Sequence, residues 1–282
     1  MVKIIADSTC DLSLDLLKKY DISIIPLHIL LGENEYEDGK NITPDEIFKW
    51  SDENNTTPKT SAPAMDTVIS VMKPLLDEQN ELICFAISED MSSSANVMRL
   101  AADELDATDR VHVVDSMNLS TGIGLLVIKA AIMASEGRTA EQILLKLEEL
   151  IPKVRASFVV DTLVYLHRGG RCSGLASMLG SALKLHPRIV VSDGKMSNDK
   201  KYRGRLRSVL MSYVKDLTED MKHADRERVF ITHSGCDRET VEAVREYIAS
   251  LDYFDEILET RAGGVISSHC GPGTLGVLFI SE

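Results

Sequence analysis

Residues 3–31 read KIIADSTCDLSLDLLKKYDISIIPLHILL, and this stretch decides the fold. The apolar run at 3–6 predicts a buried strand, because short apolar runs are typical of strands covered on both faces. Leu14–Tyr20 has apolar residues at helical spacing, and Ser23–Leu31 predicts a second strand. A strand, a helix and a strand in this order indicate a parallel sheet.

The same alternation continues to about residue 160. We expect strands at Glu81–Ser88, Val111–Asp115 and Ser157–Asp161, and helices at Ala64–Leu76, Ala95–Leu105 and Leu119–Ser135. Two more helices begin at the capping boxes of residues 43–46 and 139–142. The pattern predicts an α/β fold with a Rossmann-like N-terminal domain, a parallel sheet with helices on both faces. Ligands of such sheets bind at the carboxyl ends of the strands.

After residue 160 the pattern changes. Ser192-Asp193-Gly194 separates two short strand-like runs and predicts a hairpin. Helices are then expected at Leu206–Met221 and Arg238–Leu251, and strands at Arg228–His233, Glu256–Thr260 and Gly276–Ser281. This mixture predicts a C-terminal α+β domain. We divide the chain into residues 1–155 and 156–282.

The composition argues against a nucleic-acid binder. The chain has 282 residues, a formal charge of −13 and only 5% aromatic residues, whereas nucleic-acid binders need a basic surface and stacking rings. Residues 167–207 reverse the charge, with ten Lys or Arg against two acids. We call residues 167–207 the basic window.

Cysteine usage and the first residues indicate a cytoplasmic protein. The five cysteines are scattered and form no CxxC, so neither a disulfide framework nor a zinc site is expected. The start lacks the apolar region of a signal peptide, and no apolar run reaches membrane-spanning length. No metal and no cofactor is predicted.

Two hydroxyl-rich segments precede predicted helices. They are Thr60-Ser61-Ala62-Pro63 and Ser92-Ser93-Ser94. Free N–H groups at a helix start attract anions, so these hydroxyls could hold a carboxylate or a phosphate. The alternative is that they only cap their helices, as Ser and Thr commonly do.

Two glycine-containing segments are further candidates. Residues 267–274 carry His269 beside two glycines and a proline, which predicts an irregular, exposed backbone. In Arg168-Gly169-Gly170-Arg171, the glycines permit close backbone approach and the arginines suit phosphate. The alternatives are a turn with a structural histidine and a solvated basic face.

Familiar catalytic motifs are missing from the sequence. It has no HExxH, no GxSxG and no Walker A, and no GxGxxG follows a predicted strand. A nucleophilic pair such as Ser93 with His269 stays open, although no third, orienting residue can be named.

The chain resembles the DegV family of bacterial fatty-acid-binding proteins. The family's Asp-Ser-x-x-Asp motif matches residues 7–11 and its Thr-Ser-x-Pro loop matches residues 60–63. Its Gly-Gly-Arg segment matches residues 169–171, and its His-x-Gly-Pro-Gly matches residues 269–273. In two places the chain departs from the pattern. The family's Ser-Gly-Thr-Tyr loop reads Ser-Ser-Ser-Ala at 92–95, and its Lys-Pro is His186-Pro187.

The resemblance implies a non-catalytic protein that buries a long-chain fatty acid between two domains. It also implies a partner, the ATP-binding subunit of a fatty-acid kinase, which phosphorylates the carboxylate to an acyl phosphate for phospholipid metabolism. Transient membrane contact would allow lipid exchange. We assign the carboxylate to Thr60, Ser61, Ser92, Ser93 and His269, and phosphate or partner contact to Arg168, Gly169, Gly170 and Arg171.

Two rival functions remain at this point. One is a Ser–His hydrolase of acyl esters. The other is a regulatory or structural protein whose pocket is vestigial and collapsed.

Overall fold

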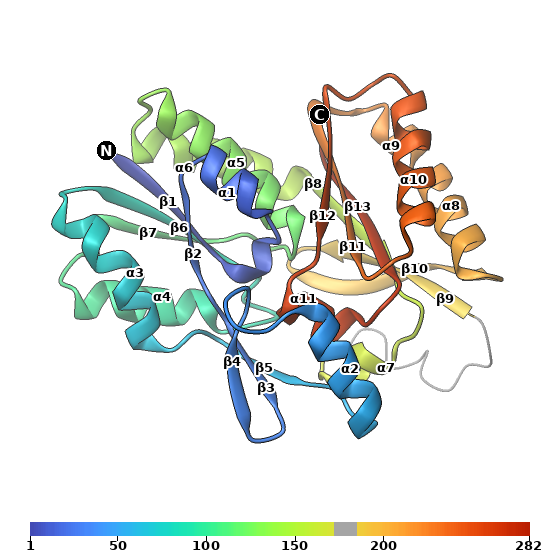
Figure 1. The fold of residues 1–282 in the computed structure, drawn as a ribbon. Coiled ribbons are helices and arrows are strands. Elements are labelled where there is room, and N and C mark those ends of the chain that lie inside the picture. The colour runs from blue at the N-terminus through green and yellow to red at the C-terminus, as the bar shows by residue number, and fades with distance from the viewer. Residues whose placement is uncertain (172–184) are drawn as a thin grey trace.

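The computed structural model describes residues 1–171 and 185–282. Its N-terminal part is a parallel sheet in the order β2-β1-β6-β7 (Figure 1), formed by Ile22–Ile25, Val2–Asp7, Glu81–Ala86 and Val111–Asp115. Helices α3 (Met65–Asp77) and α4 (Ser94–Glu104) cover one face. Helices α1 (Leu14–Lys19), α5 (Thr121–Ser135) and α6 (Ala140–Leu150) cover the other. The predicted Rossmann-like arrangement is confirmed.

The C-terminal part is a six-stranded mixed sheet in the order β10-β9-β8-β13-β11-β12. The strands are Lys195–Arg203, Leu185–Ser192, Val154–Val159, Thr274–Ser281, Ala224–Ser234 and Glu256–Arg261. Its outer face is covered by α8 (Leu206–Asp216), α9 (Thr218–Met221) and α10 (Arg238–Ser250). The α+β prediction is confirmed. The division between residues 155 and 156 stays a prediction, and it falls inside β8.

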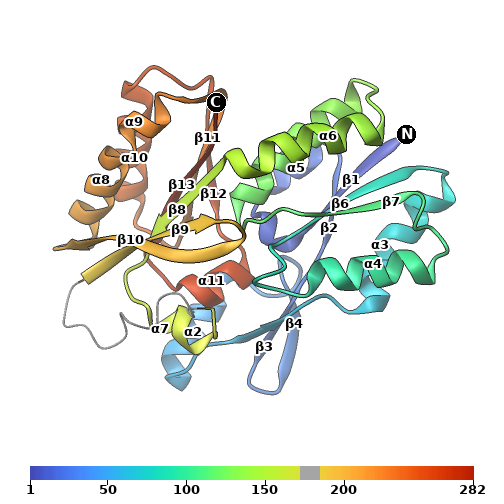
Figure 2. The same cartoon turned by 180° about the vertical axis from the view of Figure 1, so that it is seen from behind.

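Helix α5 lies between the two sheets (Figure 2). It is buried over most of its circumference because one hydrophobic core packs it against Phe85 of β6, Phe158 of β8 and Leu278 of β13. A Cβ on Gly124 would lie 2.8 Å from Leu12 Cδ2 and 3.0 Å from the Cys10 carbonyl oxygen. This glycine is therefore a close packing contact.

The expected strand Ser23–Leu31 is wrong in one respect, because it is two strands in different sheets. β2 ends at Ile25, and β3 (His28–Leu31) joins β4 (Asn34–Glu37) and β5 (Lys59–Ser61) in a small antiparallel sheet ordered β4-β3-β5. Pro26 stands at the break, where its missing N–H cannot continue a ladder. Helix α2 (Pro44–Asn54) follows, with the capping box that the sequence predicts.

The expectation of an irregular, exposed backbone at 267–274 is wrong for residues 267–270, because Gly264–Cys270 form helix α11, and all of its residues but His269 are buried. It is confirmed at 271–273, where the chain turns and Pro272 is exposed. The small side chains let the helix sit deep in the protein, and their hydroxyls are satisfied locally. Ser268 Oγ donates to the Gly264 carbonyl at 2.7 Å, and Ser267 Oγ to the Ala262 carbonyl at 3.1 Å. Gly271 ends the helix at φ +76°.

Three short helices complete the described residues: α7 (Val164–Arg168) and the 3-10 turns Ser8–Cys10 and Ile151–Lys153. Across residues 1–171 and 185–282, no helix is both long and apolar enough to cross a membrane.

Candidate functional site

A cavity of about 40 Å³ lies where α11, α7, β5, the β9–β10 hairpin and the loop after β6 meet. Four of the five residues predicted to hold a carboxylate line it, together with one arginine; the lining residues are Leu27, Thr60, Ser61, Ile87, Met91, Ser92, Leu119, Leu166, Arg171, Met196, Val265, Ile266, His269 and Cys270. Sequence segments more than 200 residues apart therefore share one small space.

Thr60 is held by a strand and not by a helix start. It pairs with Ile29 across β5 and β3, and its Oγ1 lies 2.7 Å from His269 Nε2. Helix α3 begins further along, where the N-cap Ala64 donates its N–H to His28 Nε2 at 3.2 Å. The expectation that Thr60 and Ser61 sit at a helix N-terminus is wrong, although both side chains line the cavity.

The serine loop lies at the start of α4, as predicted. Ser93 is the N-cap residue but is exposed and makes no side-chain capping bond. Ser92 Oγ lies 2.8 Å from Ser94 Oγ and lines the cavity. Among the described residues around the cavity, Ser93 is not part of the lining. The loop follows β6 at the carboxyl edge of the parallel sheet, where ligands of such sheets bind.

His269 is neutral at physiological pH. Burial, followed by the nearby charge of Arg171, lowers its pKa to about 4. Its Nδ1 has no hydrogen-bond partner and faces Gly169, where a Cβ would come within 2.2 Å of that nitrogen. An orphaned N–H costs more than an orphaned lone pair, so the proton belongs on Nε2. His269 then donates to Thr60 Oγ1, and the Thr60 hydroxyl hydrogen is left for another acceptor.

Arg171 lies in the cavity wall, although the sequence analysis grouped it with Arg168 as a partner contact. Its Nη1 donates to the Gly169 carbonyl at 2.8 Å, and Nε and Nη2 approach the Met91 carbonyl at 3.4 Å. Arg168 is exposed on α7. Gly170 has φ +72°, and this turn brings Arg171 back toward the cavity.

A second, smaller cavity of about 20 Å³ continues inward from the first. Leu119, Ile266 and Cys270 line both cavities and so form the partition between them. The inner cavity reaches Phe158 and Leu278 in the shared core. The inner lining also carries polar side chains, namely Ser120, Thr232, His233, Ser234 and Thr274, so it is of mixed character.

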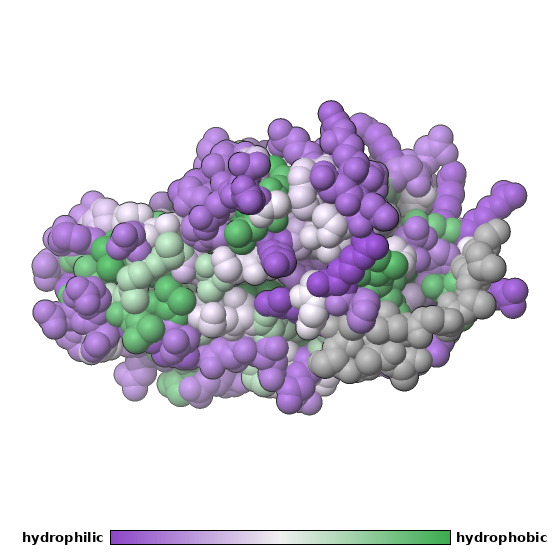
Figure 3. Space-filling model, turned by 90° about the horizontal axis from the view of Figure 1, so that it is seen from below, coloured by the Kyte–Doolittle hydropathy of each residue, from purple (hydrophilic) through white to green (hydrophobic). Residues whose placement is uncertain are grey.

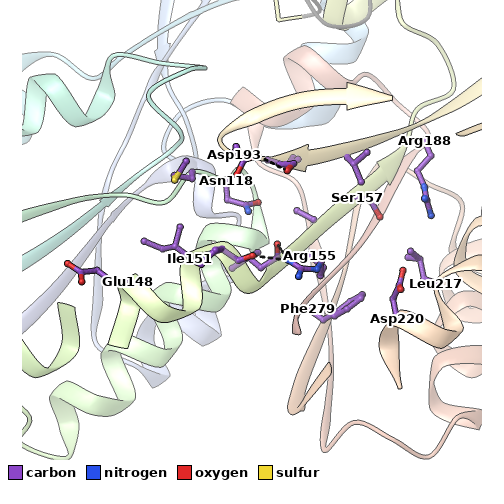
Figure 4. Close-up of a pocket in the computed structure, with 17 residues that line it drawn as sticks. Asn118, Glu148, Ile151, Arg155, Ser157, Arg188, Asp193, Leu217, Asp220 and Phe279 are labelled. Atoms are coloured by element: carbon purple, nitrogen blue, oxygen red, sulfur yellow. Dashed lines mark hydrogen bonds between the residues drawn. The ribbon is translucent and has the colours of Figure 1, made fainter. Parts of the chain in front are cut away.

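A larger hollow lies elsewhere among the described residues, over β8 and β9, with a volume of about 790 Å³ (Figure 4). Its two arginines are already engaged. Arg155 Nη1 donates to the Pro152 carbonyl at 2.9 Å, and Arg188 forms an ion pair with Asp199. Of the described residues that the sequence singled out as a site, none lines this hollow, so we place the candidate site at the smaller cavity.

The basic window is partly neutralised. Its Arg188, Lys195, Lys200 and Arg207 form ion pairs with Asp199, Asp90, Asp216 and Glu239, respectively. Lys184, like Cys172, lies outside the described residues. Acidic side chains are thus interspersed with these basic ones. Figure 3 shows, on the described part of one face of the molecule, small hydrophobic patches separated by hydrophilic side chains.

Sequence reasoning missed several lining residues. Met91, Leu119 and Ile266 look like ordinary core residues, and only their meeting across the two sheets distinguishes them. Arg171 had a usable signal, because a glycine pair just before it permits a reversal of the chain.

The comparisons with known proteins identify the family of this chain. A family model described as "Uncharacterised protein, DegV family" matches residues 1–282. A DegV domain-containing protein of Caldanaerobacter subterraneus is 33% identical, over 99% of this chain and 98% of the relative. A protein of Thermotoga maritima named fatty acid-binding protein is 31% identical, over 98% of this chain and 96% of the relative.

Solved structures show the same fold. A DegV family protein of Thermus thermophilus, described as fatty acid binding, superposes with a TM-score of 0.91 at 32% identity, covering 100% of this chain and 99% of the other. A stearic acid-binding protein of Eubacterium ventriosum gives a TM-score of 0.86 at 30% identity, covering 100% and 98%. With the fold, the motifs and the full length all in agreement, this chain belongs to the DegV family.

Proposed function

We propose that this protein binds a long-chain fatty acid, with the carboxylate among Thr60, Ser61, Ser92, Arg171 and His269. The observation that carries the proposal is that segments far apart in the sequence bring these polar groups together around one cavity, while a second cavity that shares part of its wall reaches Phe158 and Leu278 of the core. DegV relatives that are described as fatty acid binding share the fold over the whole chain.

The polar end suits a carboxylate. The Thr60 hydroxyl can donate because His269 Nε2 donates to its oxygen. Ser92 supplies a second hydroxyl, and Arg171 supplies the positive charge, since neutral His269 carries none. Hydrogen bonds to a charged group are each worth about 1.5–3 kcal/mol, so this end fixes the orientation of the ligand.

The apolar end supplies most of the affinity. Each buried CH₂ contributes about 0.8 kcal/mol, so a sixteen-carbon tail gains more from burial than the head gains from hydrogen bonds. The free volume of about 40 Å³ is little more than one water needs. Binding must therefore displace the partition of Leu119, Ile266 and Cys270. Met91 and Met196 in the wall are flexible enough to repack around a chain.

We further propose that the bound carboxylate is presented to the ATP-binding subunit of a fatty-acid kinase, with acyl phosphate as product and phospholipid metabolism as destination. Arg168 is exposed on α7 one turn from the cavity and is the residue that we assign to partner contact. In this role the chain itself is non-catalytic, works in the cytoplasm without a cofactor, and exchanges lipid by transient membrane contact.

The hydrolase alternative finds less support. Ser93 is exposed at the start of α4, whereas His269 Nε2 is engaged with Thr60. A nucleophile must lie within hydrogen-bond reach of its base. The small cavity volume favours the other rival, a protein that binds no lipid.

Native mass spectrometry of protein purified from a bacterial host separates these functions. We expect a co-purifying mass of a C14–C18 acid. Delipidated protein should then take up one equivalent of palmitic acid. Protein that arrives lipid-free and also fails to take up palmitic acid contradicts the proposal and favours a vestigial pocket. Hydrolysis of a p-nitrophenyl acyl ester that disappears in Ser93→Ala would favour the hydrolase.

A further inference from the structure

Two buried carboxylates accept hydrogen bonds at the start of helix α11, from the N-cap residue Gly263 and from Gly264, the first helical residue. Asp11 Oδ1 accepts from the Gly263 N–H at 2.8 Å, and Asp38 Oδ1 accepts from the Gly264 N–H at 2.7 Å. Asp11 is 5% exposed and Asp38 is 3% exposed. We call these two aspartates and the two glycines the carboxylate clamp.

The second oxygen of each carboxylate is also occupied. Ser120 Oγ donates to Asp11 Oδ2 at 2.5 Å, and Ser8 Oγ donates to Asp38 Oδ2 at 2.9 Å. Ser8 Oγ in turn accepts from the Leu27 N–H at 3.1 Å. Both carboxylates are therefore oriented by residues of the N-terminal part of the chain. Helix α11, which they bind, follows β12 of the C-terminal sheet, so the bonds connect the two parts.

The glycines fit the clamp closely. A Cβ on Gly263 would lie 3.1 Å from Asp11 Oδ1, and one on Gly264 would lie 2.9 Å from Asp38 Oδ1. The Gly264 Cβ would also meet Ile29 Cδ1 at 2.6 Å. The close approach of carboxylate to backbone thus depends on glycine at both positions.

Helix α11 brings a large share of the cavity wall, namely Val265, Ile266, His269 and Cys270. It has only seven residues, and a helix of this length has no stability of its own in water. Contacts with the rest of the protein must therefore fix its position. At its N-terminus the carboxylate clamp makes these contacts, and the negative charge of a carboxylate is favourable beside free helical N–H groups.

We propose that Asp11 and Asp38 are positioning residues for the lipid cavity: by holding Gly263 and Gly264, they set α11 at the depth and rotation at which His269 meets Thr60 and Ile266 closes the partition. This rests on the proposed function for its ligand, but the placement of α11 can be measured without one. Burial raises the pKa of both carboxyls, which means that the clamp is kept despite an electrostatic cost.

The test compares three variants of the full chain. Asp38→Ala removes the acceptor for the Gly264 N–H. Asp38→Asn keeps an acceptor oxygen there, and its amide can donate to Ser8 Oγ, so it serves as the rescue. Tyr213→Phe is the matched control, because Tyr213 OH also accepts from a buried backbone N–H, that of Val277 at 3.0 Å, but lines neither cavity.

Two readouts are needed. One is the affinity of delipidated protein for palmitic acid. The other is the imidazole ¹⁵N spectrum of His269 in ligand-free protein. We expect Asp38→Ala to weaken binding about tenfold, as loss of a charge-assisted hydrogen bond does, and to shift the His269 signals. Asp38→Asn should restore both. Tyr213→Phe should lose thermal stability and leave both unchanged.

The outcomes separate the two proposals. If wild-type protein binds no palmitic acid, the proposed function fails, and a His269 shift confined to Asp38→Ala still supports the placement of α11 by the clamp. If wild-type protein binds but Asp38→Ala matches Tyr213→Phe in affinity and in spectrum, the clamp is only structural and the proposal is overturned. If Asp38→Ala does not fold, Ser8→Ala, which removes the hydroxyl that donates to Asp38 Oδ2, is measured by the same two readouts. Weaker binding with shifted His269 signals would support placement of α11 by the clamp, whereas an affinity and a spectrum that match the wild type would overturn it.

Discussion

The two walls of the cavity are built in opposite ways. On one side, helix α11 is buried. Asp11 and Asp38 accept hydrogen bonds from the backbone N–H groups at its start, and its serine hydroxyls donate to nearby backbone carbonyls. On the other side, the loop of Ser92–Ser94 and the strand residue Ser61 lie partly in solvent. The lining is continuous, yet one wall belongs to the core and the other to the surface.

This difference assigns different tasks to the two walls. A wall fixed by buried bonds can define where a ligand's head lies, because moving it would leave charged and polar groups unsatisfied. A wall made of a surface loop can move aside to admit the ligand. When it moves, its polar groups replace hydrogen bonds to protein by hydrogen bonds to water, which costs little free energy. Substitutions should therefore reduce stability as well as affinity on the α11 side, and mainly affinity on the loop side.

The largest effect is expected from Gly264→Ala. Its Cβ would come within 3 Å of Ile29 Cδ1, Ile47 Cδ1 and Asp38 Oδ1, so the free energy of unfolding should fall by about 2–3 kcal/mol. The control is Gly170→Ala on the other side, which meets no atom but has φ +72° and should cost about 1 kcal/mol. Urea unfolding of both variants measures these free energies. Equal losses of stability in the two variants would contradict the proposed difference between the walls.

The next effect concerns the hydroxyls. Thr60→Ala combined with Ser92→Ala removes two of the three hydroxyl side chains that line the cavity and should weaken palmitic acid binding at least about tenfold. The melting temperature should fall modestly, because Thr60→Ala leaves the N–H of His269 Nε2 without its acceptor, whereas Ser92 lies on the surface loop. Calorimetry of the delipidated double variant checks this. An unchanged affinity would show that the carboxylate lies elsewhere.

A smaller effect distinguishes the two arginines. Arg171 lines the cavity and Arg168 does not. Arg171→Ala should weaken fatty-acid binding by about fivefold, since a half-buried cation opposite a carboxylate is partly screened. Arg168→Ala should leave that affinity intact and slow acyl-phosphate formation by a partner kinase. If Arg168→Ala weakened fatty-acid binding and Arg171→Ala did not, Arg171 would be assigned to partner contact and not to the cavity.

The smallest effect is a shift in one titration. Arg171 is the second cause, after burial, of the lowered pKa of His269. Removing this cation in Arg171→Ala should raise the pKa of His269 from about 4, while burial keeps it below that of a free histidine. NMR titration of the ligand-free variant measures the midpoint. A midpoint unchanged from the wild type would mean that the guanidinium points away from the imidazole.

The α/β architecture could be predicted because local signals agree there with the final structure. The apolar run of β1 predicts a strand, and the capping boxes of α2 and α6 predict the helix starts. None of these predictions needs contacts with residues far away in the sequence. The β9–β10 hairpin is of the same kind, because Asp193 and Gly194 both take the positive φ that its two-residue turn needs.

The rest depended on tertiary contacts. The strand β5 has only three residues and exists because β3 offers it a partner. Helix α11 reads as a Gly- and Ser-rich turn until the clamp and the surrounding core impose a helix. Asp38 carries no local signal at all, since its role comes from a glycine 226 positions away. The polar residues of the site could thus be predicted from the sequence. The strand β5, the helix α11 and the buried Asp38 that orient them could not.

The position of β13 has a consequence for biosynthesis. This strand, Thr274–Ser281, lies between β8 and β11 in the middle of the six-stranded sheet. Until these residues have been synthesised, β8 and β11 have no ladder to share, and the apolar residues of α5 that face them stay uncovered. The nascent chain therefore carries an exposed hydrophobic surface through most of translation, and pairing over such long sequence separations is slow. The growing polypeptide should be a substrate for chaperones that bind at the ribosome.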